Sequence, residues 1–465
     1  LPMLPRRPQL DAAQLRHTVA SGFFSDRPTS TIHRGIDQLR PACVVRVDPR
    51  GDHQTLRYWR PPETSELRGL GDEDYDRLLR ATLFDAVEGA LPRSGDVLSE
   101  LSGGLDSSSV SAIASIVLGT QTPSRRVHTV SYVDPRPDTD EGSYQRDLCA
   151  RHDLSNYRLR FDETFALADL VGTQTVGLHT FQSLVAEDRL RRNRLGGHVC
   201  LTGHGGDAVL GNILQPNFLA DLMMSRQWSR WWRALRSYGG AEGWSLLPLL
   251  RMSLDRQVRR GRRVAPHWLR GGETNPPGDP EPVFRLPARA KLYRDIVTLA
   301  PHSFDDPRSP IEFRHPLLDR SLVELALRLP WEQLGRPGRG RILQRRVLAD
   351  VLPPSIRERT DKADFTAAVI HCFRSVVQRH PEVSGAPMLA ALGVVEPAPF
   401  SRALDRALHG ICDDDQSAVF AATTFECWLQ ANARHRPPSL GALAAWAGPP
   451  RGAQASTGAP VNSGS

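Results

Sequence analysis

Lysine is almost absent from this sequence of 465 residues. Of its 59 basic residues only Lys291 and Lys362 are lysines, which leaves 57 arginines. The two side chains are not interchangeable, because lysine presents a compact point charge and arginine a wide planar fork. Each lysine that the sequence retains is therefore a candidate for a pocket that an arginine does not fit.

Other absences exclude whole classes of protein. The six cysteines include no C-x-x-C pair, which argues against a disulfide framework and a zinc site. No stretch approaches the roughly 20 uninterrupted apolar residues of a membrane span, and the first residues lack the apolar run of a secretory signal. We therefore expect a cytoplasmic protein with reduced thiols and no membrane partner. The net charge of +7 suits an enzyme that handles ATP.

The chain is too long for a single hydrophobic core, and its pattern changes along its length. Beyond residue 96, short apolar runs alternate with helical segments, which is typical of a parallel sheet with crossover helices. The patterns predict strands at 43–47, 55–59, 97–101, 127–133 and 199–202, and helices at 72–88, 107–118, 141–152, 317–329 and 340–352. Residues 447–465 have no periodicity and predict a disordered tail.

One loop carries the chemistry. Residues 98–109 run L-S-E-L-S-G-G-L-D-S-S-S, so that Gly103 and Gly104 follow an apolar strand while Ser107 and Ser108 begin a helix. Backbone N–H groups and a helix N-terminus then face an anion, which the missing Cβ atoms allow to come close. Asp106 supplies a carboxylate suited to a Mg²⁺ ion on bound phosphates. The loop predicts a phosphate cradle, and because no G-K-S or G-K-T follows, it is not of the Walker type.

The run S-G-G-L-D-S-S resembles the pyrophosphatase-type loop of the asparagine synthetase, β-lactam synthetase and lasso-peptide cyclase superfamily. Three later segments resemble further motifs of that superfamily: a second glycine-rich segment at 201–207, a helical-domain signature at 311–327, and a segment at 357–365 that carries a pyrophosphate-contacting lysine. Together the four motifs cover residues 96–365 in the order that the superfamily has them.

The resemblance implies a fold and a reaction. The fold is an α/β core with a parallel sheet and a pyrophosphatase loop, of the adenine nucleotide alpha hydrolase-like type, with a helical C-terminal region. Residues 1–60 would be the remnant of an N-terminal amidotransferase-like β domain, and residues 61–446 the ATP-binding domain. Superfamily members split ATP between its α- and β-phosphates, leave AMP on a substrate carboxylate and release pyrophosphate.

It also implies a role for each matching residue, with ATP and Mg²⁺ as cofactors. The phosphates would be bound by Ser102, Gly103, Gly104, Asp106, Ser107 and Ser108; the adenosine bordered by Leu101, Tyr132 and Gly203; and Mg²⁺ held by Asp106 and Asp207. Lys362 would neutralise the charge that builds on the departing pyrophosphate. The alternative is that Lys362 is a surface lysine beside two aspartates, which is the role we expect for Lys291.

The sequence departs from asparagine synthetases at two positions. Those enzymes place acids where this chain has His204 and Ala208, which argues against asparagine synthesis. The chain given starts at Leu1 rather than at a cysteine nucleophile, so we expect no glutaminase and an amine that already belongs to the substrate. The segments T-G-H-G-G-D and F-R-H-P-L-L-D resemble those of lasso-peptide cyclases, in which a peptide's own N-terminal amine attacks an adenylated side-chain carboxylate.

We therefore predict a lasso-peptide cyclase that acts on a linear core peptide. A leader-recognition protein and a leader peptidase are the expected partners, with no nucleic acid. The alternative enzyme is an asparagine or β-lactam synthetase-like amidoligase for a small acid. A catalytically dead scaffold is the alternative of another class, and the intact loop and Lys362 argue against it.

Three further features allow more than one interpretation. His204 either orients the substrate and accepts a proton from the attacking ammonium, or bonds only to backbone. Arg314, Pro316 and Asp319 predict a packing element, and Glu312 fits either kind of role. The segment 224–270 carries five tryptophans and eleven arginines, which predicts an amphipathic helix pair on the core, a docking surface for a partner, or a single-strand nucleic-acid site.

Overall fold

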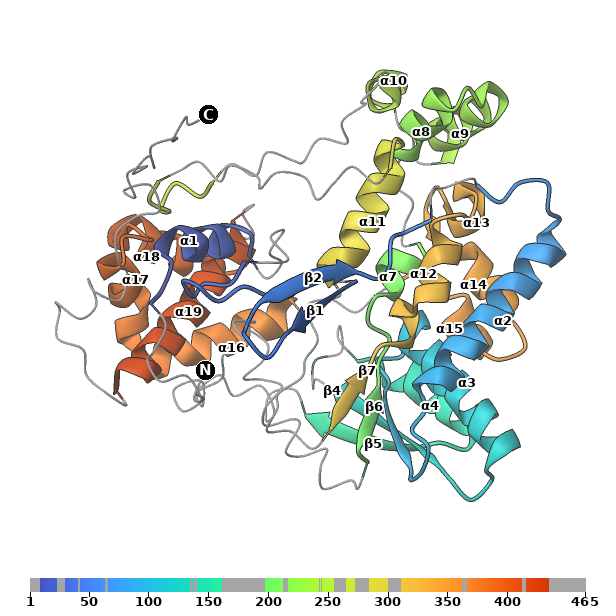
Figure 1. The fold of residues 1–465 in the computed structure, drawn as a ribbon, viewed down its shortest axis with the longest axis horizontal. Coiled ribbons are helices and arrows are strands. Elements are labelled where there is room, and N and C mark those ends of the chain that lie inside the picture. Colours follow the sequence, from blue (N-terminus) through green and yellow to red (C-terminus); the bar gives the residue numbers. More distant parts are fainter. Residues whose placement is uncertain are drawn as a thin grey trace, which may run out of the picture.

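The computed structural model places two hydrophobic cores in the chain, one around a β-sheet and one among C-terminal helices (Figure 1). The described residues are 9–22, 30–40, 42–62, 66–133, 136, 140–160, 197–211, 216–241, 243, 245–254, 265–271, 284–299, 311–361, 366–411 and 415–434. Lys362 and the predicted tail at 447–465 lie outside them.

The sheet is parallel throughout, as predicted, with the order β5-β4-β3-β6-β7. Its strands are β3 (Val97–Glu100), β4 (Val127–Val133), β5 (Ser155–Arg160), β6 (Val199–Leu201) and β7 (Glu312–Arg314). The chain runs outward from β3 to β5 and then returns to place β6 on the other side of β3. The loops after β3 and β6 therefore lie next to each other at the carboxyl edge, where α/β sheets bind ligands.

Both faces of this sheet are covered. Val97, Val199 and Leu201 point into the main core, while Leu98 and Cys200 point into a smaller cluster with Val130, Ile311 and Phe313. This alternation follows from the twofold period of a strand, and it explains why the central strands are apolar on both sides. The helices α2 (Asp72–Ala90), α3 (Leu105–Gln121) and α4 (Gly142–His152) gather on one side (Figure 1).

The rest of the main core is built from short elements. They are α7 (Gly206–Val209), α8 (Phe218–Met224), α9 (Trp228–Ala241), α10 (Leu246–Leu254), α11 (Pro287–Leu299), η3 (Pro316–Leu318), α12 (Arg320–Ala326), α13 (Trp331–Leu334), β8 (Gly335–Arg336), β9 (Arg339–Gly340), α14 (Ile342–Val347) and α15 (Pro354–Arg357). The single helix predicted at 317–329 is wrong. Asp319 is extended, and its carboxylate caps α12 by accepting the Ser321 N–H at 2.8 Å, so the segment divides there.

The second core joins the two ends of the described chain. It contains α16 (Thr366–Arg379), η4 (Pro381–Gly385), α17 (Pro387–Ala391), α18 (Pro397–Leu408) and α19 (Gln416–Arg434). Helix α1 (Ala12–Ala20) packs with them, because Leu15 and Val19 are fully buried in the same cluster. The predicted domain boundary at residue 60 stays a prediction, and residues 61–446 contribute to both cores.

The N-terminal hairpin is confirmed. Strand β1 (Cys43–Val47) pairs antiparallel with β2 (His53–Arg57), two residues earlier than predicted for the second strand. The turn between them closes when the Asp48 N–H donates to the Asp52 carbonyl at 2.9 Å, and Gly51 adopts a φ of +91° that disfavours other residues.

The described parts of the Trp/Arg segment include the helices α9 and α10, which agrees with the first of the three interpretations, but not all of the described tryptophans pack on the core. Leu235 and Tyr238 supply the buried side of α9, while Trp228 and Trp232 are 56% and 53% exposed. Trp268 is fully buried in the second core, where its indole N–H donates to Asp415 at 2.7 Å. No helix among the described residues is long and apolar enough to cross a bilayer.

Candidate active site

The loop between β3 and α3 is held in shape by its own hydroxyl groups. The oxygens of Ser102 and Ser107 lie 2.9 Å apart, the Ser102 N–H donates to Ser107 Oγ, and the Gly104 N–H donates to Ser102 Oγ, each at 3.2 Å. Gly103 has a φ of +83°. Ser108 is fully buried, and its hydroxyl has no hydrogen-bond partner among the described residues. The loop is a tight turn at the carboxyl end of a central strand, as the sequence predicted.

The loop after β6 packs directly on this turn. A Cβ atom on Gly203 would lie 2.5 Å from the Ser107 nitrogen, and one on Gly206 would lie 2.3 Å from the Asp106 Cγ. Gly205 has a φ of +88°, and a Cβ there would lie 2.4 Å from Leu318. Such distances are too short for any side chain. The second glycine-rich segment therefore packs on the first turn of α3 through Gly203 and Gly206, and on Leu318 of η3 through Gly205.

Three charged side chains meet where these loops join. The Arg341 guanidinium donates from one nitrogen to Asp106, at 2.7 Å, and to Asp207. Burial raises the pKa of Asp106, and Asp207 adds to this, while Arg341 lowers it. Gln344 supports the group by donating to Asp106 and, at 3.0 Å, to Ser109. The two aspartates predicted to share a metal ion thus lie side by side, with Arg341 between them as their counter-ion.

This arrangement fits a small divalent cation. Two carboxylates that reach one nitrogen atom can also reach one metal ion, and Mg²⁺ is commonly held by one or two carboxylates plus phosphate oxygens and water. Among the residues that the structure describes, no three His, Cys, Asp or Glu side chains gather closely enough to hold a metal by themselves. A Mg²⁺ ion at Asp106 and Asp207 would therefore need the phosphates of a bound nucleotide.

A second buried cation fixes the phosphate loop from the opposite side. Arg359 donates to the Gly103 carbonyl at 3.2 Å and to the Glu141 carboxylate at 2.7 Å. Its guanidinium lies 4.2 Å from the centre of the Tyr144 ring. The side chains of Arg359 and Glu141 are only 6% and 7% exposed. Lys362, which lies outside the described residues, follows Arg359 by three positions in the sequence.

Two histidines lie at the ends of β6 and β7. The rings of His204 and His315 pack edge to face with their centres 5.2 Å apart. Nδ1 of His315 shares a 2.7 Å hydrogen bond with the Thr202 hydroxyl, which also accepts the His204 N–H. Burial, with a smaller contribution from His204, lowers the pKa of His315 to about 4, so this imidazole is neutral at neutral pH. Sequence reasoning named His204 as a candidate and left the same choice, a functional or a structural role, open for His315.

The residues predicted to border adenosine are less closely grouped than those of the phosphate loop. Leu101 is fully buried in the main core, so only its backbone faces the loop, and its carbonyl accepts the Ser131 hydroxyl at 2.6 Å. Tyr132 packs against the second core. Gly203 lies against Ser107, as described above. The adenosine contacts therefore stay a prediction.

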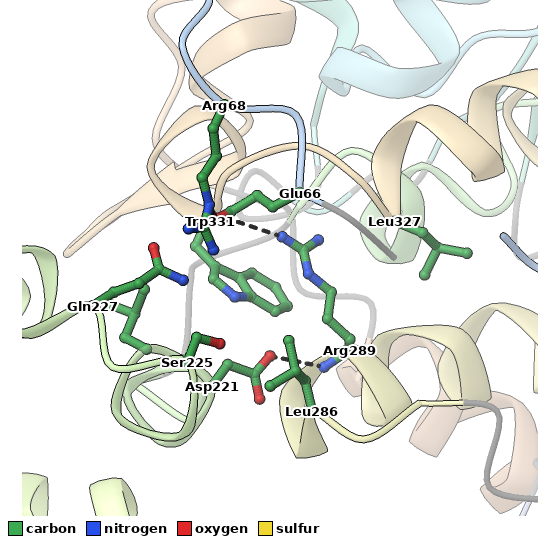
Figure 2. A pocket seen from close by; sticks show the side chains of 10 residues that line it. Glu66, Arg68, Asp221, Ser225, Gln227, Leu286, Arg289, Leu327 and Trp331 are labelled. Carbon is green, nitrogen blue, oxygen red and sulfur yellow. Dashed lines mark hydrogen bonds and ion pairs between the residues drawn. The ribbon is translucent and has the colours of Figure 1, made fainter. Parts of the chain in front are cut away.

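A cavity of about 420 Å³ lies between α8, α11, α13 and the segment before α2 (Figure 2). Arg289 crosses it, with its guanidinium 4.0 Å from the centre of the Trp331 ring and 3.8 Å from Glu66. Asp221 accepts the backbone N–H groups of Ala288 and Arg289 at the start of α11. Because these charges already satisfy one another, the cavity is a buried joint between helices rather than a ligand site.

Asp221 and His315 give the protein opposing pH dependences. Burial raises the pKa of Asp221 to about 6 from an ordinary 3.8, so its share of stability, about 3 kcal/mol, is lost as the pH rises from 4 to 6. The pKa of His315 falls to about 4 from 6.5, so its share is lost as the pH falls through the same range.

In Asp221→Asn, we expect the pH dependence of stability that His315 causes to be no longer opposed by that of Asp221. The free energy of unfolding, measured with urea at pH 4, 5 and 6, should rise with pH more steeply in this variant than in the unmodified protein. In His315→Asn, the free energy of unfolding should instead fall as the pH rises. An unchanged slope in Asp221→Asn would show that Asp221 is ionised normally in the folded state.

Comparison with known protein families matches residues 78–430 to asparagine synthase. The chain belongs to the asparagine synthase family. The match covers the sheet, both glycine-rich loops and most of the second core. A solved structure that also matches, U34-tRNA thiolase NcsA from Methanococcus maripaludis, has 12% sequence identity over 73% of this chain and 80% of its own, with a TM-score of 0.25. Comparison with curated proteins gives no match.

Membership of the asparagine synthase family confirms the predicted superfamily and makes the chain an ATP-dependent ligase. The parallel α/β core predicted for it is also confirmed. Sequence reasoning missed Arg341 and Arg359. Arg359 lies in the motif at 357–365, where only Lys362 was assigned a role, and Arg341 lies between two motifs and does not stand out among 57 arginines.

Proposed function

We propose that this asparagine synthase family member is a lasso-peptide cyclase. It adenylates an Asp or Glu side chain of a linear core peptide and joins it to the peptide's N-terminal amine. The observation that carries the proposal is the histidine pair beside the two glycine-rich loops. His204, which stands where asparagine synthetases have an acid, lies against a neutral His315, in the loop after β6 that also carries Asp207. An imidazole at this position can take up the proton that a peptide ammonium must lose.

The reaction divides into two steps. In the first, a carboxylate oxygen of the peptide attacks the α-phosphorus of ATP and pyrophosphate leaves, with its charge balanced by Lys362. Mg²⁺, held by Asp106, Asp207 and phosphate oxygens, would supply further positive charge. In the second, the amine nitrogen attacks the acyl carbon, AMP leaves, and the ammonium proton passes to a base for which His204 is our candidate. One amide forms and one molecule of water is lost from the peptide overall.

The chain's own residues order the site for this chemistry. Arg359 holds the Gly103 carbonyl, and Gly203 and Gly206 bring the second loop against the first turn of α3. Holding the amine and the activated carboxylate together lowers the entropic cost of their reaction. This cost is large when a peptide must be folded into a ring. A leader-recognition protein and a leader peptidase would supply the core peptide.

The test is product analysis with ATP, Mg²⁺ and a linear core peptide. We expect AMP and pyrophosphate, and a peptide lighter by one water that resists carboxypeptidase. Acetylating the amine, or changing the acceptor Asp or Glu to Asn or Gln, should abolish the water loss, and ammonium should not restore it. ADP and phosphate would rule out adenylation. Efficient conversion of aspartate and ammonia to asparagine would support the small-acid amidoligase instead.

A further inference from the structure

An exposed apolar surface at α8, α9 and α10 is separate from the candidate active site. The three helices gather at one end of the molecule, beside α11 (Figure 1). They carry six of the large apolar side chains that the described residues expose: Met224, Trp228, Trp232, Leu246, Leu247 and Leu254, each between 42% and 67% exposed. Elsewhere such residues are thinly spread except on the N-terminal hairpin. Large exposed apolar patches on soluble domains mark interaction sites.

The exposed residues form two stripes along the helices. Trp228, Trp232 and Arg236 follow one another at intervals of four on α9, and so share one face. On α10, Leu247 and Leu254 are two turns apart with Arg251 between them, also on one face. On α9, Leu235 and Tyr238 lie on the neighbouring side of the helix and are buried, and on α10 Leu249 lies opposite the stripe and is buried. The two stripes therefore do not belong to the core and form an exposed surface.

Cations are interleaved with the apolar side chains rather than set around them. Arg233, Arg236 and Arg251 are exposed and form no ion pair with any described residue. Arg230 differs, because it turns inward and pairs with Glu66 and Glu332. A surface of this kind needs a counter-surface with carboxylates at fixed positions between apolar groups. An amphipathic helix offers that pattern, whereas hydrocarbon would leave each buried guanidinium without a partner.

We propose that the surface formed by α9 and α10 docks an acidic, leucine-rich amphipathic helix of a partner protein. Trp and Arg are the residues that most often carry the binding energy of protein interfaces. The two stripes combine both types with leucine. The tryptophans and leucines would pack against the apolar face of the partner helix, and Arg233, Arg236 and Arg251 would pair with its carboxylates. This docking role is separate from the adenylation site and does not depend on which acid the enzyme activates.

The test uses the full chain and a fluorescein-labelled helical probe peptide with leucines at i, i+4 and i+7 and glutamates beside them. Fluorescence anisotropy should show saturable binding that weakens as salt rises. A probe with lysine in place of each glutamate should not bind. Trp228→Ser with Trp232→Ser should weaken binding by about 30-fold, and Arg233→Glu with Arg236→Glu by a similar factor.

The matched control is Leu78→Ser with Tyr157→Ser, which removes apolar side chains that are 40% and 39% exposed on other elements. It should leave binding unchanged, and all variants should keep pyrophosphate exchange with ATP. Equal binding of both probes would overturn the proposal, as would loss of binding in the control. Saturable binding to phosphatidylserine vesicles or to a single-stranded oligonucleotide, abolished by the tryptophan variant, would assign the surface to lipid or nucleic acid instead.

Discussion

Replacing Lys362 by alanine is expected to lower the rate of adenylation by about 10²–10³-fold and leave the fold intact, since one preorganised charge at a developing anion is worth that much. Lys362 follows Arg359 by three residues in the sequence, and Arg359 is bonded directly to the phosphate loop through the Gly103 carbonyl. The rate is measured by ATP-dependent pyrophosphate release, and the fold by urea denaturation.

The other lysine provides a matched control. Lys291 pairs with Asp295 one turn along α11, and its side chain is 44% exposed, as a surface lysine should be. Lys291→Ala should therefore leave the rate unchanged. Lys362→Arg should remain slow, because a guanidinium is wider than an ammonium and cannot act as a point charge. Near-normal turnover in Lys362→Arg would show that the position needs only a positive charge.

Local pattern was enough to predict the parts of the site that depend on neighbouring residues. The apolar strand before Gly103, the two glycines and the serines that begin α3 lie within a dozen residues, and their spacing alone predicts a strand, a turn and a helix. The short strands β5 and β7 were missed. Strand β5 is an edge strand of mostly polar composition with no buried residue, and β7 has three residues, too few to show a period.

Long-range pairing could not be predicted. Arg341 and Asp106 are 235 positions apart, and Arg359 and Gly103 are 256 apart. With 57 arginines in the chain, no local property marks the two that are buried at the loop. The packing of α1 against α19 could not be predicted for the same reason. Leu15 and Val19 indicate that one face of α1 is apolar, but they do not indicate which surface covers it.

The largest expected effect on stability is at the buried ion pair of Arg359 and Glu141. Arg359→Ala should lower the free energy of unfolding by about 3–5 kcal/mol, since it removes the guanidinium that pairs with the buried Glu141 carboxylate. This is a large part of the roughly 5–15 kcal/mol that stabilises an ordinary domain. Urea denaturation measures it. Arg339→Ala is the control, because Arg339 pairs with Glu358 at the surface, where both are about half exposed, and it should lower the free energy of unfolding far less.

Replacing both Arg359 and Glu141 separates the effect of the ion pair on stability from its effect on ATP binding. In Arg359→Leu with Glu141→Leu no charge is left buried, so the free energy of unfolding should recover most of what Arg359→Ala lost. The Gly103 carbonyl nevertheless loses its donor in both variants, so both should bind ATP more weakly than the unmodified protein, as isothermal titration would show. If the double variant recovered ATP affinity along with stability, Arg359 would serve only to neutralise Glu141. If it recovered stability alone, Arg359 positions the phosphate loop.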